Sequence, residues 1–243
     1  MFDAFISDPH FGHKRIIEYC KRPFANVQEM NEQMIKNYND VVGTNGKVLW
    51  TGDCFFYGNK EARAIMDQLN GEKYVVLGNH DADAHKMVSR GFKWAVDKLY
   101  FKIAGRNIVA CHYDQAMMRN PWDDRYMELR PKLEESQILI HGHTHQKIKV
   151  LLDQVHLGVD SWDYRPATHD EVADLVKSIP VKWTNQMNKE LKDLQKYSET
   201  IRLIKQLRSI GSDCKLQEDI LASDRFDKFR GLGWEGETKE RAM

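Results

Sequence analysis

The residues in this sequence that could do chemistry follow five short apolar runs. Each run predicts a buried strand, and acidic, amide or imidazole side chains stand where each run ends. In an open α/β sheet the chain leaves the sheet at the carboxyl ends of the strands, so side chains there can converge on one crevice. The runs with their polar residues are Phe2 to Ser7 with Asp8 and His10, Val48 to Thr51 with Gly52 and Asp53, Tyr74 to Leu77 with Gly78, Asn79, His80 and Asp81, Ile108 to Cys111 with His112, and Ile138 to Ile140 with His141, Gly142, His143, Thr144 and His145.

The side chains of this set form a mixed nitrogen and oxygen donor site. Two carboxylates, one amide oxygen and four or five imidazoles suit divalent manganese, iron or zinc, and no thiolate is required. Seven donor groups exceed what one tetrahedral ion needs, so we expect two ions that share one carboxylate. Asp53 is the natural bridge, and Gly52, Gly78 and Gly142 are expected to make tight turns with positive φ.

In order, residue type and glycine placement, these five motifs resemble those of the calcineurin-like metallophosphoesterase superfamily, over roughly residues 1 to 175. The resemblance implies two divalent metal ions, for which we favour manganese, with iron, zinc, nickel or cobalt as alternatives. It also implies that His80 is the catalytic histidine beside the scissile phosphate. The implied ligands are Asp8, His10 and His145 for the first metal, Asn79, His112 and His143 for the second, and Asp53 for both.

Other polar residues are expected to contact the substrate or to orient the ligands. His13 lies one helical turn past His10 in a segment from Phe11 to Ile17 and is a candidate substrate contact. Arg119 and Arg125 belong to a long segment, 113 to 136, which would be either a substrate-facing loop or a packed surface excursion. Asp81 and His141 are candidates for orienting the ligands. For His141 the alternative is a structural role as a buried histidine.

The expected chemistry is hydrolysis of a phosphoester bond. Two cations would polarise the phosphoryl oxygens and lower the pKa of a bridging water, so that hydroxide attacks phosphorus in line. His80 would stabilise the developing charge or protonate the leaving oxygen. We expect a small phosphorylated or cyclic-phosphate substrate, with a nuclease or nucleic-acid end-processing phosphodiesterase as the alternative.

Two other functions of the same superfamily are less well supported. Protein phosphatases carry an orienting aspartate and then a phosphate-binding arginine where this chain has Phe56 and Tyr57, which weakens that interpretation. A noncatalytic scaffold would need neither His80 nor a complete ligand set.

Composition limits partners and location. The 36 basic and 36 acidic residues cancel, so net charge gives no support for nonspecific nucleic-acid binding. Four cysteines without paired spacing, and an opening run interrupted by Asp3 and Asp8, predict a reduced, cytoplasmic protein without a signal peptide. No stretch approaches the ~20 apolar residues that span a bilayer.

Strand and helix patterns alternate in the first half, which predicts an α/β fold. The resemblance implies a four-layer sandwich of two mixed β-sheets flanked by helices, over residues 1 to 180. Residues 181 to 243 would add a C-terminal extension: an amphipathic helix that packs on the main domain or mediates self-association, followed by a charged and aromatic tail.

Overall fold

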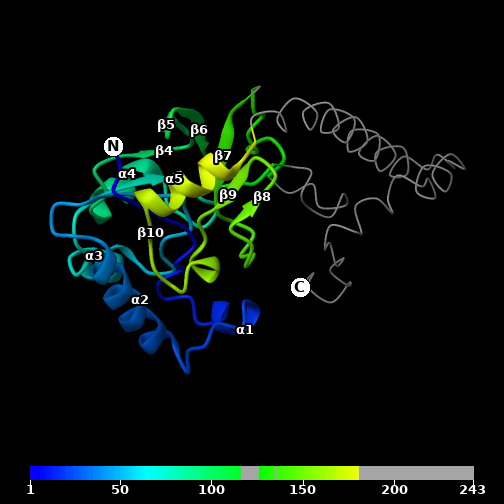
Figure 1. Ribbon diagram of the computed structural model, residues 1–243. Coiled ribbons are helices and arrows are strands. Elements are labelled where there is room, and N and C mark those ends of the chain that lie inside the picture. The colour runs from blue at the N-terminus through cyan, green and yellow to red at the C-terminus, as the bar shows by residue number, and fades with distance from the viewer. Residues whose placement is uncertain (116–125, 135, 181–243) are drawn as a thin grey trace, which may run out of the picture. The chain divides into compact units, whose positions relative to one another are not determined.

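Two β-sheets form the centre of the computed structural model, which describes residues 1–115, 126–134 and 136–180 (Figure 1). The first sheet contains, in spatial order, β10 (Ala167–Thr168), β1 (Ala4–Ile6), β2 (Lys47–Trp50), β3 (Glu72–Val76) and β4 (Ala95–Val96). The second contains β5 (Leu99–Ile103), β6 (Arg106–Ala110), β7 (Ile138–His141), β9 (Gln154–His156) and β8 (Val150–Leu151).

Both sheets are mixed. In the first sheet β1, β2, β3 and β4 are parallel and β10 is antiparallel to β1. In the second, β6, β7 and β9 are parallel, while β5 and β8 are antiparallel edge strands. The five strands that precede the candidate site residues are therefore all members of the parallel parts of the two sheets.

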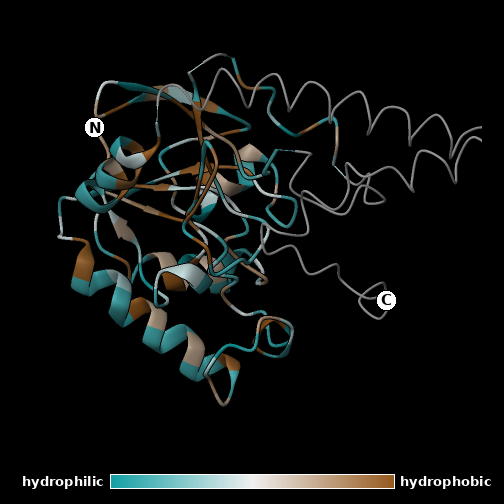
Figure 2. Cartoon of the chain, turned by 45° about the vertical axis from the view of Figure 1, so that its right-hand side comes forward, coloured by the Kyte–Doolittle hydropathy of each residue, from teal (hydrophilic) through white to brown (hydrophobic). Residues whose placement is uncertain are grey.

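Alternation of side chains along the first sheet separates two hydrophobic cores. On β2, Val48 and Trp50 enter a core with residues of the helices, whereas Leu49 enters a second core. That second core joins Phe5 of β1 to Ile108 of β6 and to residues of β7 and β9, so the inner faces of the two sheets pack together. Figure 2 shows hydrophobic residues concentrated along these strands.

Helices cover the other face of the first sheet and contact strands of both sheets. The helices are α1 (Ile16–Tyr19), α2 (Val27–Val41), α3 (Asn59–Met66), α4 (Ala84–Arg90) and α5 (His169–Ser178), with a 3-10 helix, η2 (Val159–Ser161). Buried hydrophobic residues of α1 to α4 belong to the first core, whereas those of α5 belong to the second. α2 begins at Val27 because the Asn26 side chain accepts hydrogen bonds from two backbone N–H groups of the first turn. Met30, Met34 and Tyr38 recur at helical spacing on its buried face. α5 packs against β9 and β10.

The predicted architecture, two mixed sheets flanked by helices, is confirmed. Of the segment from Phe11 to Ile17, only Ile16 and Ile17 are helical, so His13 precedes α1. The predicted extension, 181–243, lies outside the described residues. Among the described helices, none has the length and apolar character needed to cross a membrane.

Candidate metal centre

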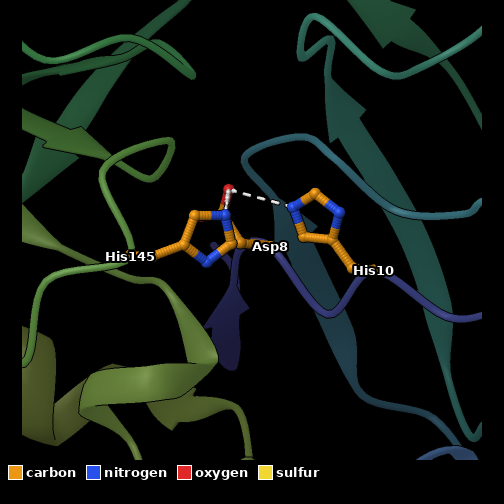
Figure 3. Close-up of side chains that lie close together, drawn as sticks. All are labelled: Asp8, His10 and His145. Carbon is orange, nitrogen blue, oxygen red and sulfur yellow. Dashed lines mark ion pairs between the residues drawn. The ribbon is translucent and has the colours of Figure 1, made fainter. Parts of the chain in front are cut away.

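Three of the predicted ligands, Asp8, His10 and His145, meet where β1 and β7 end (Figure 3). The Nε2 atoms of His10 and His145 both lie 3.9 Å from the same oxygen, Oδ1 of Asp8. Asp8 and His10 are buried, and the chosen donor atoms of the three residues all lie within 4.8 Å of one another. This spacing allows three donors to surround one ion.

A second group contains Asp53, His112 and His143, whose donor atoms are equally close. Nε2 of His112 lies 3.1 Å from Nδ1 of His143 and 3.1 Å from Oδ1 of Asn79. The second predicted ligand set is thus brought together as well, from the ends of β2, β3, β6 and β7.

Asp53 lies between the two groups. Its Oδ2 is 3.5 Å from Nε2 of His10, and its Oδ1 is 3.5 Å from Nε2 of His112. Each oxygen of one carboxylate therefore faces a different group, which is the geometry that a bridging ligand requires. All seven predicted ligands converge on one place.

Hydrogen bonds leave the Nε2 atoms of two histidines available for a metal. Nδ1 of His112 lies 2.7 Å from the carbonyl oxygen of Thr51, and Nδ1 of His145 lies 2.9 Å from Oδ2 of Asp160. When Nδ1–H donates to a carbonyl or carboxylate, Nε2 is the ring nitrogen that remains to bind a metal once it has lost its proton. In both residues Nε2 is the atom that faces the neighbouring carboxylate.

The backbone at this centre is strained. Asp8, His10, Asp53, His143 and His145 all have φ between 51° and 70°, a left-handed conformation that is uncommon for residues other than glycine. Such strain persists where surrounding contacts enforce it, and it concentrates at functional sites.

Glycines at the centre meet two separate needs. Gly52 has a φ of 95°, as predicted, but φ is not positive at Gly78 or Gly142, so that prediction was wrong for these two. Gly142 is required for close approach instead, because a Cβ atom there would overlap Oγ of Ser7 and Oδ2 of Asp8.

Backbone hydrogen bonds hold the ligand loops against one another. The N–H groups of Asp8 and His10 donate to the carbonyls of Gly52 and Asp53. The carboxylate of Asp81 accepts from the backbone N–H groups of Asp53, Cys54 and Gly78, each at 2.9 Å, and so ties the loop after β2 to the loop after β3. The orienting role expected for Asp81 stays a prediction, to which these contacts lend support.

An ion pair that the sequence did not reveal supports the first group. The guanidinium of Arg22 donates through Nε and Nη2 to the two oxygens of Asp160, at 2.8 Å each, and Asp160 in turn accepts from His145. Arg22 also donates to the carbonyls of Asp8 and Pro9. The side chains of Arg22 and Asp160 are 0% and 2% exposed, so this chain of contacts is internal. Asp160 follows an apolar run, as the predicted ligands do, and this pattern could have identified it from the sequence. No such pattern marks Arg22.

Charge is concentrated at the centre. Burial opposes ionisation of Asp53, but His112, His10 and His80 together lower the pKa of its carboxyl far below the usual value. Burial likewise opposes protonation of His112. The nearby carboxylate of Asp53 outweighs the effect of burial and raises the pKa of that imidazole to about 9. Nε2 of His10 is buried and has no hydrogen-bond partner among the described residues. A buried ionised carboxylate beside an unpartnered imidazole nitrogen fits a cation, and the nitrogen and oxygen donors fit divalent metals.

The remaining predicted site residues lie in different places. His80 is exposed at the edge of the centre, with its ring centroid 5.7 Å from that of His10. His13 lies beside His10, with 3.4 Å between their Nδ1 atoms. His141 is buried, and its Nδ1 contacts the carbonyl oxygen of Gly142, so it contacts the turn that carries His143. Arg119 and Arg125 lie outside the described residues.

Comparisons with known proteins identify the family to which the chain belongs. Residues 1–157 match the model of the calcineurin-like phosphoesterase superfamily domain, so the chain belongs to this superfamily. It is 33% identical over 181 residues to the uncharacterized protein MJ1445 of Methanocaldococcus jannaschii, covering 71% of this chain and 89% of that protein. It is 31% identical over 199 residues to the gene 66 protein of Mycobacterium phage L5, covering 72% of this chain and 94% of that protein. The crystal structure of a protein of unknown function, AQ665 from Aquifex aeolicus, matches with 25% identity and a TM-score of 0.56, over 71% of this chain and 97% of that one.

Proposed function

We propose that this chain is a phosphoesterase that uses two divalent metal ions to hydrolyse a phosphodiester or phosphomonoester bond in a small phosphorylated or cyclic-phosphate compound. Membership of the superfamily supports phosphoester chemistry in general. The observation that carries the proposal is the position of Asp53, whose two oxygens face two separate groups of donors.

The residues would divide into two ligand sets that share one carboxylate. Asp8, His10 and His145 would hold one ion, and His112, His143 and Asn79 the other, with Asp53 contacting both. When bound, two such ions supply Lewis acidity toward the phosphoryl oxygens and lower the pKa of water at the site. Manganese suits the oxygen-containing donor set, and iron, zinc, nickel and cobalt are alternatives.

His80 is the proposed catalytic residue. Its backbone N–H donates to Oδ1 of Asp53 at 2.9 Å, which fixes the residue against the centre, while its side chain is exposed. The exposed imidazole lies beside the ligand cluster, with its centroid 5.7 Å from that of His10, so it could reach a phosphate bound there. From there it could donate a proton or a hydrogen bond to the leaving oxygen.

The test separates metal binding from turnover. Metal-stripped protein resupplied with manganese should hydrolyse bis-nitrophenyl phosphate or nitrophenyl phosphate, and the ratio of the two rates would direct the search for the substrate. Because His80 contacts Asp53 through its backbone, His80→Ala should keep the metal content and lower kcat by about 10²- to 10⁴-fold. His85→Ala, an exposed histidine on α4, is the matched control. Full turnover by His80→Ala would contradict the assigned role.

A further inference from the structure

Aromatic side chains form a surface at the edge of the candidate metal centre. They are His13, Tyr19 and Phe56, and we call them the aromatic platform. Phe56 is 37% exposed and Tyr19 46% exposed, so neither ring is part of the hydrophobic cores. Scattered exposed aromatic residues need no explanation, but these three lie together beside residues proposed to bind and cleave a phosphoester.

The rings follow one another outward from His80. The centroid of Phe56 is 4.8 Å from that of His80. His13 stacks on Phe56 with the centroids 3.8 Å apart and an interplanar angle of 10°. Tyr19 meets His13 edge to face at 6.4 Å. The aromatic platform therefore begins at the proposed catalytic residue and continues to the exposed end of α1.

Basic side chains accompany the rings. The guanidinium carbon of Arg15 lies 4.8 Å from the centroid of the Tyr19 ring, and both Arg15 and Lys14 are exposed. Proteins bind nucleotides with this combination, because aromatic rings and guanidinium planes stack on bases while cations attract phosphate. His13 and Arg15 each lie against one of these rings, but Phe56 and Tyr19 remain partly exposed, and a sugar phosphate without a base has no planar group to stack there.

We infer that the aromatic platform binds the base of a nucleotide whose phosphate lies at the metal centre, so that the substrate class is nucleoside phosphoesters. This inference rests on the proposed function and makes it more specific.

The test is calorimetric binding of three phosphomonoesters to the full chain loaded with manganese. Adenosine monophosphate should bind about 5- to 150-fold more tightly than ribose 5-phosphate, the range equivalent to one stacked base. Phenyl phosphate should bind less tightly than adenosine monophosphate. Equal affinities for the nucleotide and ribose 5-phosphate would overturn the inference. If phenyl phosphate bound as tightly as the nucleotide, the aromatic platform would bind any planar aryl ester, and the assignment of a nucleotide would be overturned.

Variants locate the effect on the aromatic platform. Tyr19→Leu and Phe56→Leu should each bring the ratio of the two affinities toward one, whereas Tyr100→Leu, a 65% exposed tyrosine on β5, should leave the ratio unchanged. A ratio retained in both platform variants would overturn the assignment.

Hydrolysis of bis-nitrophenyl phosphate separates the two proposals. Hydrolysis without a preference for the nucleotide would overturn this inference alone. A preserved preference without hydrolysis of any ester would overturn the proposed function alone.

Discussion

Replacing Asp160 by asparagine should weaken both the fold and the first metal site. Asp160 accepts two hydrogen bonds from Arg22 and lies 2.9 Å from Nδ1 of His145. Asparagine keeps the shape of the side chain but removes its charge and one acceptor oxygen. Breaking a buried ion pair from one side costs about 3–5 kcal/mol. Because Arg22 retains the carbonyls of Asp8 and Pro9, we expect the lower end, about 3 kcal/mol in the free energy of unfolding.

The effect on metal affinity follows from the contact with His145. A carboxylate behind a ligand imidazole fixes the ring and its tautomer, and losing such a partner typically lowers metal affinity about 10- to 100-fold. That corresponds to about 1.4–2.7 kcal/mol of binding free energy.

Two measurements check this prediction: urea unfolding of metal-free protein and calorimetric titration with manganese. Asp174→Asn is the matched control, because its pair with Lys177 is exposed and should change stability by less than about 1 kcal/mol. Combining Asp160→Asn with Arg22→Gln should cost less than the sum of the single substitutions, since both break one ion pair. An unchanged manganese affinity in Asp160→Asn would show that the contact between Asp160 and His145 does not support the metal site.

Three further outcomes are expected. Gly142→Ala should lower the free energy of unfolding by at least about 2 kcal/mol in a urea titration, because its Cβ overlaps Ser7 and Asp8; wild-type stability would show that the loops can move apart. Hydrogen bonds from Arg165 lower the pKa of Glu171 from 4.5 to about 2, so the ionised carboxylate stabilises the fold above about pH 4.5 and that stabilisation is lost as the pH falls toward 2. The free energies of unfolding of the wild type and Glu171→Gln, both metal-free, should therefore differ by about 1 kcal/mol at neutral pH and converge near pH 2. A difference that does not change with pH would contradict this prediction. Removal of bound metal by a chelator should lower Tm, since an ion at 100 times its Kd adds about 2.7 kcal/mol; an unchanged Tm in a thermal melt would argue against tight binding to the folded state.

The sequence was sufficient for the parts of the site that follow a local rule. An apolar run followed by a polar turn identified the strands β1, β2, β3, β6 and β7, because burial on both faces and an abrupt change to polar residues are properties of neighbours along the chain. The resemblance then divided the ligands into two sets, and the structure brings together these same sets.

Contacts between distant segments could not be predicted in this way. Arg22 and Asp160 are 138 positions apart, and an isolated arginine before a proline carries no sign that it will be buried against a carboxylate. The stacking of His13 on Phe56 likewise depends on how the loops after β1 and β2 lie in space. Positive φ was wrongly predicted for Gly78 and Gly142, where glycine instead allows close approach of other atoms. Close approach depends on atoms elsewhere in the chain, so the local sequence does not reveal it.

Asp53 is proposed to join two metal ions in one centre. The most direct test of this proposal is the number of manganese ions bound per chain, measured by native mass spectrometry on wild type and Asp53→Asn, with ester hydrolysis recorded on the same samples. We expect two ions in the wild type, and fewer ions with loss of hydrolysis in the variant. A wild type that binds no more than one ion, or an Asp53→Asn protein that keeps two ions and full hydrolysis, would contradict it.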